Sequence, residues 1–380
     1  MPDSTYGELE LALHRARRGV YEVVLRLVDP QSQAEVAPVR GLAAIDREAL
    51  AEQATPDAYG RQLAAQVFAD AAVRGLYQRA RAALERAEVL LRLRIAIEPT
   101  APELHDLRWE LLRDPDTDAP LATSERIVLS RFVRSKDWRP IRLRPRARLR
   151  AVIAVAAPTN AGDYGLAPFD AAGEVARARE ALGELEARVV GLAEPLGLDR
   201  LVDALRDGPD IVYLACHSAL TRQQGPVLYL QNEAGAAAPV GGAELALRIG
   251  ELPQAPRLMV LASCESAGTP GAEAGGTGQS ALAPLLADAG VPAVLAMQGK
   301  ITMATARSFM PRFFRELRVD GQIDRAVAVA RGAVRAHRDP AGRAGGRRWV
   351  VLARESIPSS GRAPSRRGSG CSAATANWPS

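Results

Sequence analysis

From Arg150 onward the chain alternates between continuous apolar runs and amphipathic segments, and this alternation constrains the fold more than any other feature. A strand that is apolar on both faces belongs to a sheet that helices cover on both sides. The pattern therefore predicts an α/β fold with a mostly parallel sheet flanked by helices on both faces. The runs are AVIAVAA, RVVGLA, DIVYLAC, RLMVLAS and AVLAM, the helices expected with them lie at about 171–187, 198–207, 241–251, 279–289 and 302–318, and a helix at about 321–337 precedes a last run, WVVLA.

The part of the chain before Arg150 has a mixed pattern. Residues 9–28 read as a strand hairpin that turns at Gly19, and the segment to about residue 50 is expected to be strand-rich. One or two amphipathic helices are predicted within 58–88, then a strand with one buried face in LLRLRIAIEP. A short helix follows in ELHDLRWELLRDP, and a strand in RIVLSRFV. The domains predicted are a strand-rich extension over 1–52, the α/β domain over 58–354, and a disordered Ser/Gly/Pro/Arg-rich tail over 355–380.

The basic balance of the chain comes from its tail. The net charge is +5 and the pI about 9.4, values that by themselves suggest a nucleic-acid partner. From Arg343 to the end, however, seven arginines face one acidic residue, Glu355, and the rest of the chain is close to neutral. No interleaved aromatic residues accompany these arginines to stack on bases. We therefore expect no nucleic-acid partner.

The sequence also predicts where the protein resides. No apolar run approaches the roughly 20 residues of a membrane helix. The first ten residues have neither the basic start nor the apolar stretch of a secretory signal. Three scattered cysteines, at 216, 264 and 371, do not make a disulfide framework and fit a reducing compartment. We expect a cytoplasmic protein with no membrane partner.

Two reactive side chains follow two of the predicted strands. His217 comes directly after DIVYLAC, and Cys264 directly after RLMVLAS. Ligands of open α/β sheets bind outside the carboxyl ends of the strands. A histidine there can take the proton of a thiol, or lower the pKa of the thiol, and so create a nucleophile. The backbone amides of Ser218 and Cys264 are then the candidate donors to the oxyanion.

Other interpretations of these residues stay open. A cysteine near the end of a buried strand is often an inert core residue, and a lone histidine is often structural. Cys216 is expected to face the core, because neighbouring side chains of a strand point to opposite faces. The cysteines and His217 lack the paired spacing of a zinc site, so we expect no metal and no cofactor. The loop GTPGAEAGGTGQS has no lysine before Ser280, which favours an active-site loop over a phosphate loop.

The two blocks DIVYLACHS and RLMVLASCESAG resemble those of a CHAT domain, a bacterial relative of caspases and separases. The resemblance extends to ELHDLRWELLRDP, to APLATSERIVLSRF and to LLADAGVPAVLAMQGKITMATARSFMPRFFREL, and covers roughly residues 58–354 in the right order. It implies a caspase-like fold and a cysteine endopeptidase, with Cys264 as nucleophile and His217 as general base and then acid. It also implies a bacterial signalling or defence setting, with a protein partner that activates the enzyme in trans.

A second hypothesis is a catalytically inactive CHAT-fold interaction or scaffold module. Ser218 stands where the family usually has glycine, and its side chain would narrow the oxyanion pocket. Hydrolysis of a peptide library, or its absence, separates the two hypotheses.

The candidate residues of a substrate pocket favour substrates of opposite charge. The loop PTNAGDYGLAPFD supplies Asp163 and Asp170, which would favour a basic side chain of a protein or peptide substrate. The loop after AVLAM supplies Gln298 and Lys300, which would favour an acidic one. Both preferences stay open.

Overall fold

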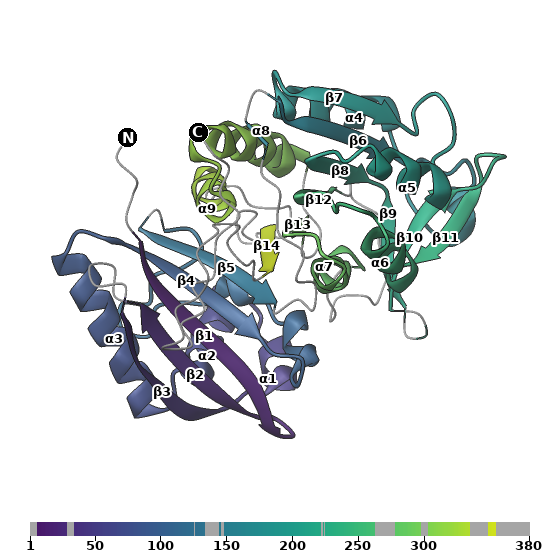
Figure 1. Ribbon diagram of the computed structural model, residues 1–380. Coiled ribbons are helices and arrows are strands. Elements are labelled where there is room, and N and C mark those ends of the chain that lie inside the picture. Colours follow the sequence, from purple (N-terminus) through teal and green to yellow (C-terminus); the bar gives the residue numbers. More distant parts are fainter. Residues whose placement is uncertain are drawn as a thin grey trace.

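The computed structural model describes residues 6–28, 34–124, 126–133, 144–145, 148–221, 223, 225–262, 278–297, 303–334 and 349–354. Within these residues an eleven-stranded sheet has the order β3-β2-β1-β4-β5-β14-β13-β12-β8-β6-β7. Its strands are β1 Tyr6–Arg17, β2 Val20–Val28, β3 Glu35–Ala44, β4 Leu90–Ile97, β5 Ile127–Val133, β6 Arg150–Val155, β7 Glu186–Val190, β8 Ile211–Ala215, β12 Leu258–Ala262, β13 Ala293–Met297 and β14 Trp349–Arg354. The neighbours are parallel except in β1–β2, β2–β3 and β13–β14. The last strand in the sequence, β14, lies between β5 and β13 and joins the two halves of the sheet (Figure 1).

Helices cover both faces of the sheet half that β6, β7, β8, β12 and β13 form. On one face Tyr213 of β8 and Val260 of β12 share a core with α4 (Ala171–Leu182), α8 (Met303–Asp320) and α9 (Ile323–Ala333). On the other face Leu214 and Met259 share a core with α5 (Leu198–Arg206), α6 (Gly242–Gly250) and α7 (Gly278–Asp288). These strands are apolar at successive positions because each position faces one of two cores. The predicted α/β class and its two layers of helices are confirmed.

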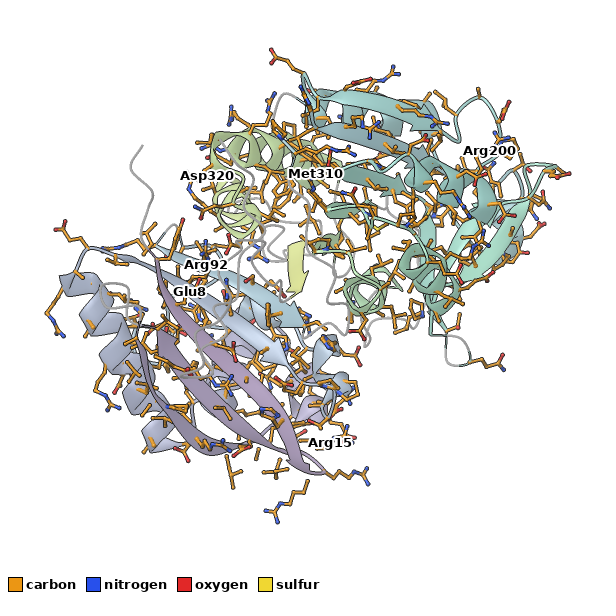
Figure 2. All side chains as sticks on the ribbon, in the orientation of Figure 1. Glu8, Arg15, Arg92, Arg200, Met310 and Asp320 are labelled. Carbon is orange, nitrogen blue, oxygen red and sulfur yellow. The ribbon has the colours of Figure 1, made fainter. Side chains whose placement is uncertain are left out.

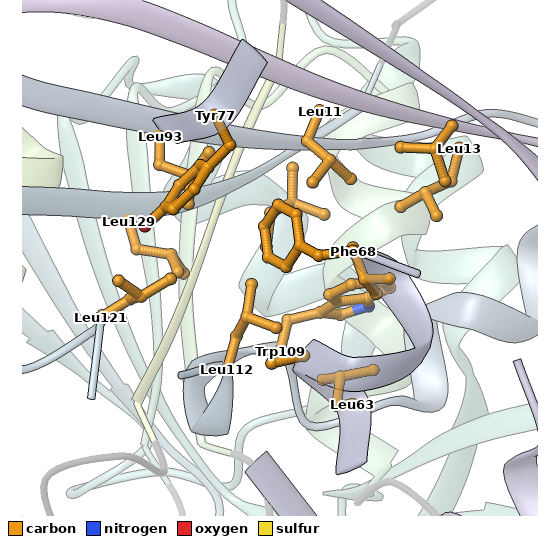
Figure 3. Close-up of a cluster of buried hydrophobic side chains, with 14 of the residues drawn as sticks. Leu11, Leu13, Leu63, Phe68, Tyr77, Leu93, Trp109, Leu112, Leu121 and Leu129 are labelled. Carbon is orange, nitrogen blue, oxygen red and sulfur yellow. The ribbon is translucent and has the colours of Figure 1, made fainter. Parts of the chain in front are cut away.

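The N-terminal half packs helices against one face of β1 to β5. These helices are α1 (Arg47–Ala51), α2 (Pro56–Val67) and α3 (Ala71–Arg86). Asp46, Thr55 and Asp70 cap them, because each side-chain oxygen accepts a hydrogen bond from a backbone amide of the first turn. The core beneath them includes Trp109, whose Nε1 donates to the carbonyl of Leu104 at 2.8 Å (Figure 3).

The segment around Trp109 differs from the single short helix that we expected. It contains two 3₁₀ helices, η1 (Pro102–Asp106) and η2 (Trp109–Leu111). Pro102 lies at the start of the first, and the buried Trp109 and Leu111 anchor the second in the core. Short 3₁₀ segments of this kind commonly serve as connectors.

Strand β4 is buried on both faces, whereas its alternating pattern predicted one. Arg92 and Arg94 are only 5% and 6% exposed. The guanidinium of Arg92 lies 2.7 Å from the carboxylate of Asp324 on α9 and stacks over the ring of Tyr6. Glu8 of β1 lies 3.4 Å from Arg92 (Figure 2), and Arg94 forms an ion pair with the same carboxylate at 3.3 Å. The prediction was wrong because partners from other parts of the chain, Asp324 of α9 for Arg92 and Glu8 of β1 for Arg94, bury the charged face.

A second, three-stranded sheet follows β8 and was absent from our expectations. It has the order β11-β10-β9, all antiparallel, with β9 His217–Thr221, β10 Gly225–Gln231 and β11 Ala237–Gly241. The chain therefore passes from the large sheet to the small one between Ala215 and His217. Among the helices in the described part of the chain, none is long and apolar enough to cross a membrane.

Candidate active site

His217 occupies the junction between the two sheets. Strand β8 ends at Ala215, Cys216 links the strands, and His217 opens β9. In the small sheet His217 pairs with Tyr229 of β10. Its side chain is 1% exposed. His217 therefore lies at the carboxyl end of a central strand, the position expected for a site residue, and it is as buried as a core residue.

The ring of Phe169 contacts this histidine, and two tyrosines lie nearby. The ring centroids of Phe169 and His217 lie 5.5 Å apart at an interplanar angle of 71°, an edge contact. Tyr229, the cross-strand partner of His217, makes an edge contact with Tyr164 at 5.3 Å. Phe169 and Tyr164 belong to the segment between β6 and α4, and through Phe169 this segment contacts the histidine that follows β8. Phe169 and Tyr229 could not be identified from the sequence, because these contacts are tertiary.

The imidazole of His217 is held in its uncharged form. Burial lowers its pKa from the ordinary value of 6.5, and the backbone of Ala167 raises it by less. The contact with Ala167 falls short of full hydrogen-bond geometry, since neither ring nitrogen has a hydrogen-bond partner among the described residues. An uncharged imidazole with a free nitrogen can accept a proton, which is what a general base must do.

The two aspartates predicted for a substrate pocket lie in this same segment and have local partners. Asp170 caps α4 by accepting a hydrogen bond from the amide of Gly173 at 2.9 Å, and its carboxylate lies 3.9 Å from Arg177. Asp163, exposed in the 3₁₀ helix η4 (Ala161–Tyr164), accepts a hydrogen bond from the side chain of Asn160 at 3.2 Å. The cap gives Asp170 a structural task in addition to any contact with substrate.

Glu174 is a buried carboxylate that the sequence analysis missed. It is 5% exposed and lies in the first turn of α4. The hydroxyl of Tyr213 donates to it at 2.8 Å, and the guanidinium of Arg177 at 2.7 Å. The signal in the sequence was a glutamate beside Val175 on the apolar side of a helix. The hydrogen bond fixes α4 to β8, the strand that leads to His217.

The remaining predicted residues divide into two groups. Cys216 packs in the core on the α5, α6 and α7 side of the sheet, as predicted, and burial raises the pKa of its thiol to about 12. Ser218 lies in β9 opposite Leu228 and is partly exposed. Its backbone does not require glycine, because Glu88 and Asp118 are the non-glycine residues with positive φ in the described part of the chain. The predicted residues that lie outside the described residues are Cys264, Gln298 and Lys300.

Comparison with known families identifies this arrangement. A model of the CHAT domain matches residues 58–360. The chain belongs to the CHAT domain family. The resemblance inferred from DIVYLACHS and RLMVLASCESAG is therefore confirmed. The described residues of this CHAT chain include no group of His, Cys, Asp and Glu side chains that could hold a metal ion.

Solved structures similar to this CHAT chain are distant. The separase–securin complex of Saccharomyces cerevisiae aligns with a TM-score of 0.40 and 10% identity over 74% of this chain and 17% of the other. Gingipain R aligns with a TM-score of 0.42 and 10% identity over 75% of this chain and 67% of the gingipain chain. The complex of the Porphyromonas gingivalis RgpB pro- and mature domains aligns with a TM-score of 0.41 and 11% identity over 77% of this chain and 70% of the other. This chain spans about a sixth of the separase chain, and these scores are too low to transfer residues or activity. No curated protein matches its sequence.

Proposed function

We propose that this CHAT chain is a cysteine endopeptidase that hydrolyses peptide bonds with Cys264 as nucleophile and His217 as general base. The observation that carries the proposal is a buried, uncharged histidine at the carboxyl end of β8, beside the strand that leads to Cys264. Burial, to which the ring of Phe169 contributes, keeps His217 uncharged and able to accept a proton at neutral pH. That form is the one that peptide-bond hydrolysis by a thiol needs.

The strand register supports the pairing of the two residues. Strands β8 and β12 are parallel neighbours, with Ala215 opposite Ala262. His217 follows Ala215 by two positions, and Cys264 follows Ala262 by two. Ala215 and Ala262 both face the core that contains α4 and α8. Phe169, which packs against this same core, contacts His217, so the imidazole lies near this face. We propose that the thiol of Cys264, two positions after Ala262, is directed to the same face.

The proposed reaction proceeds in two steps. His217 takes the proton of the Cys264 thiol while the sulfur attacks the carbonyl carbon, and the amides of Ser218 and Cys264 donate to the oxyanion. His217 then gives its proton to the leaving amine as the C–N bond breaks and a thioester forms. Water, deprotonated by His217, attacks the thioester, and the thiol and the carboxylic acid product are released. The reaction uses no cofactor.

The substrate of this reaction is a protein or peptide. Asp163 and Asp170, in the segment that also carries Phe169, favour a basic side chain, and Gln298 with Lys300 would favour an acidic one. We further propose that the enzyme acts in a bacterial cytoplasm, in signalling or defence, and that a protein partner activates it in trans. Cleavage profiles with and without candidate partners test both points.

The test of the proposal is cleavage of a peptide library by the wild type and by three variants. Cys264→Ala and His217→Ala should lose cleavage. Cys216→Ala is the matched control, because the Cys216 thiol is buried on the opposite face of the sheet, and it should cleave like the wild type. Cleavage that survives in Cys264→Ala would overturn the proposal.

Ser218 allows the alternative, an inactive CHAT-fold interaction module, to be tested directly. If Ser218 blocks the oxyanion pocket, the wild type is inactive and Ser218→Gly gains cleavage. The backbone of β9 accommodates serine, which favours the active form. Equal cleavage by the wild type and Ser218→Gly would exclude a blocking role for the serine.

A further inference from the structure

We propose that Phe169 is a positioning residue for His217, whose ring fixes the orientation of the imidazole and shields it from water. The inference rests on the proposed function and adds to it a residue outside the dyad. Phe169 makes no bond to the reacting atoms. It acts through the histidine that does.

The contact between the two rings has the geometry of a favourable aromatic pair. At 5.5 Å and 71° the rings meet edge to face, which is one of the arrangements that aromatic pairs prefer. Phe169 also packs against the core that contains α4 and β6. One side of Phe169 is thus anchored while the other limits the rotation of His217. Neither ring nitrogen makes a hydrogen bond of normal geometry to a described residue, so the contact with Phe169 and the weaker contact with the Ala167 backbone orient this imidazole.

The position of Phe169 is itself fixed by the start of α4. The next residue, Asp170, caps the helix through Gly173. One turn later Glu174 accepts the hydrogen bond from Tyr213 on β8. Strand β8 therefore holds α4, α4 holds Phe169, and Phe169 packs on the histidine that follows β8. These contacts explain how Phe169, a residue in a connecting segment, acquires a defined position.

Burial is the larger of the two causes that set the charge state of His217. Among the described residues, the titratable groups nearest to His217 on the packed elements are Tyr213 on β8, Tyr229 on β10, Asp163 and Tyr164 in η4 and, at the start of α4, Asp170 and Glu174 with Arg177. None of them is a cause of the lowered pKa, which burial lowers and the Ala167 backbone partly restores. Removal of the Phe169 ring admits water to the imidazole, and the pKa of His217 should then rise toward its ordinary value.

Loss of the ring should affect the reaction in two ways. A histidine free to rotate spends less time in the orientation that accepts the thiol proton, which lowers kcat more than it raises KM. A higher pKa of His217 moves the acid limb of the pH profile to higher pH. A residue with a merely structural role would lower stability without either change.

The experiment compares Phe169→Ala and Phe169→Leu with the wild type. Peptide cleavage is followed from pH 5 to 9, and the imidazole of His217 is titrated by NMR, with His217→Gln to assign its signal. Tyr164→Leu is the matched control, because Tyr164 lies in the same segment and contacts Tyr229 instead of His217. Thermal unfolding of each variant establishes that it folds. Phe169→Leu, which keeps an apolar side chain, provides a folded variant should Phe169→Ala be unstable.

We expect Phe169→Ala to lower kcat roughly tenfold, with little change in KM, and to raise the pKa of His217. Phe169→Leu should lie between it and the wild type, and Tyr164→Leu should titrate like the wild type. A folded Phe169→Ala protein with an unchanged His217 titration and pH profile would overturn the inference. If the pKa of His217 rises in Phe169→Ala but the wild type cleaves no peptide, the shielding role of Phe169 is upheld and the proposed peptidase activity is overturned. Failure of the inference and failure of the proposed function are therefore distinguishable.

Discussion

Glu110 and Arg331 meet in the interior of the protein, with the carboxylate 3.8 Å from the guanidinium and both side chains fully buried. Glu110 belongs to η2, beside Trp109, and Arg331 to α9. Arg131 of β5 donates to the same carboxylate at 3.0 Å. Arg331 also donates to the carbonyl of Leu129 at 3.0 Å. One carboxylate thus serves two buried arginines and fastens α9 to the N-terminal half.

Replacement of Glu110 by glutamine should destabilise the protein strongly. The amide keeps the shape of the side chain, but it removes the buried negative charge that Arg131 and Arg331 share. Breaking a buried ion pair in this way costs about 3–5 kcal/mol. Unfolding in urea measures the loss. Glu22→Gln is the control, because its partner Arg40 is exposed and such a pair contributes at most about 1 kcal/mol. A loss no larger than that of the control would contradict the role assigned to Glu110.

The stability of the protein should fall as the pH drops below neutral. Burial, and then the nearby charge of Arg131, lower the pKa of His105 to about 4. In the unfolded chain the value is 6.5, so between pH 6.5 and 4 the unfolded state binds more protons than the folded state. The free energy of unfolding therefore rises with pH across that window, by about 3 kcal/mol at most for this residue.

Urea unfolding at a series of pH values tests the contribution of His105. His105→Phe removes the group and should flatten the curve between pH 4 and 6.5. The remaining slope contains the contribution of His217, whose pKa burial also lowers. A pH dependence identical in His105→Phe and the wild type would show that His105 is not buried as an uncharged group.

Cys216 should not react with thiol reagents in the folded protein. Its side chain is fully buried, and burial raises the pKa of the thiol to about 12, so almost no thiolate exists at pH 8. Iodoacetamide followed by mass spectrometry locates the modified cysteines, and the same reaction in urea is the control in which Cys216 should be labelled. Labelling of Cys216 in the native protein at the rate seen in urea would contradict its place in the core.

The sequence predicted the parallel strands well because their burial is a local pattern. In β8 and β12 every position faces a core, and a continuous apolar run identifies such a strand without any knowledge of its neighbours. The charged face of β4 could not be predicted in the same way. Arg92 is buried because Asp324 of α9 lies against it, and no local pattern contains that contact.

In the candidate site, too, residues with a local sequence signal could be predicted, and residues that matter for their tertiary contacts could not. His217 was identifiable because it directly follows an apolar run, which places it at an end of a strand. Phe169 and Glu174 were not, because the first matters for its contact with His217 and the second for its bond to Tyr213. The small sheet that begins at His217 was missed because β9 and β11, the strands on either side of β10, are short and only partly apolar.

Tyr213 provides the most stringent test of the arrangement around His217. Tyr213→Phe removes one hydroxyl and with it a hydrogen bond to the buried Glu174, at a cost of about 1–3 kcal/mol. If the start of α4 holds Phe169 in place, the loosened helix should also raise the pKa of His217, in the direction of Phe169→Leu but by less. NMR titration and urea unfolding measure the two effects separately.

Tyr59→Phe is the matched control for this prediction. The hydroxyl of Tyr59 accepts a hydrogen bond from the amide of Arg108 at 3.1 Å, so the variant also loses one buried tyrosine contact, but in the N-terminal half. It should lose stability and leave the titration of His217 unchanged. If Tyr213→Phe titrated like Tyr59→Phe, the link from β8 through α4 to Phe169 would be refuted, and the edge contact of the two rings would have to be maintained by the core beneath Phe169 alone.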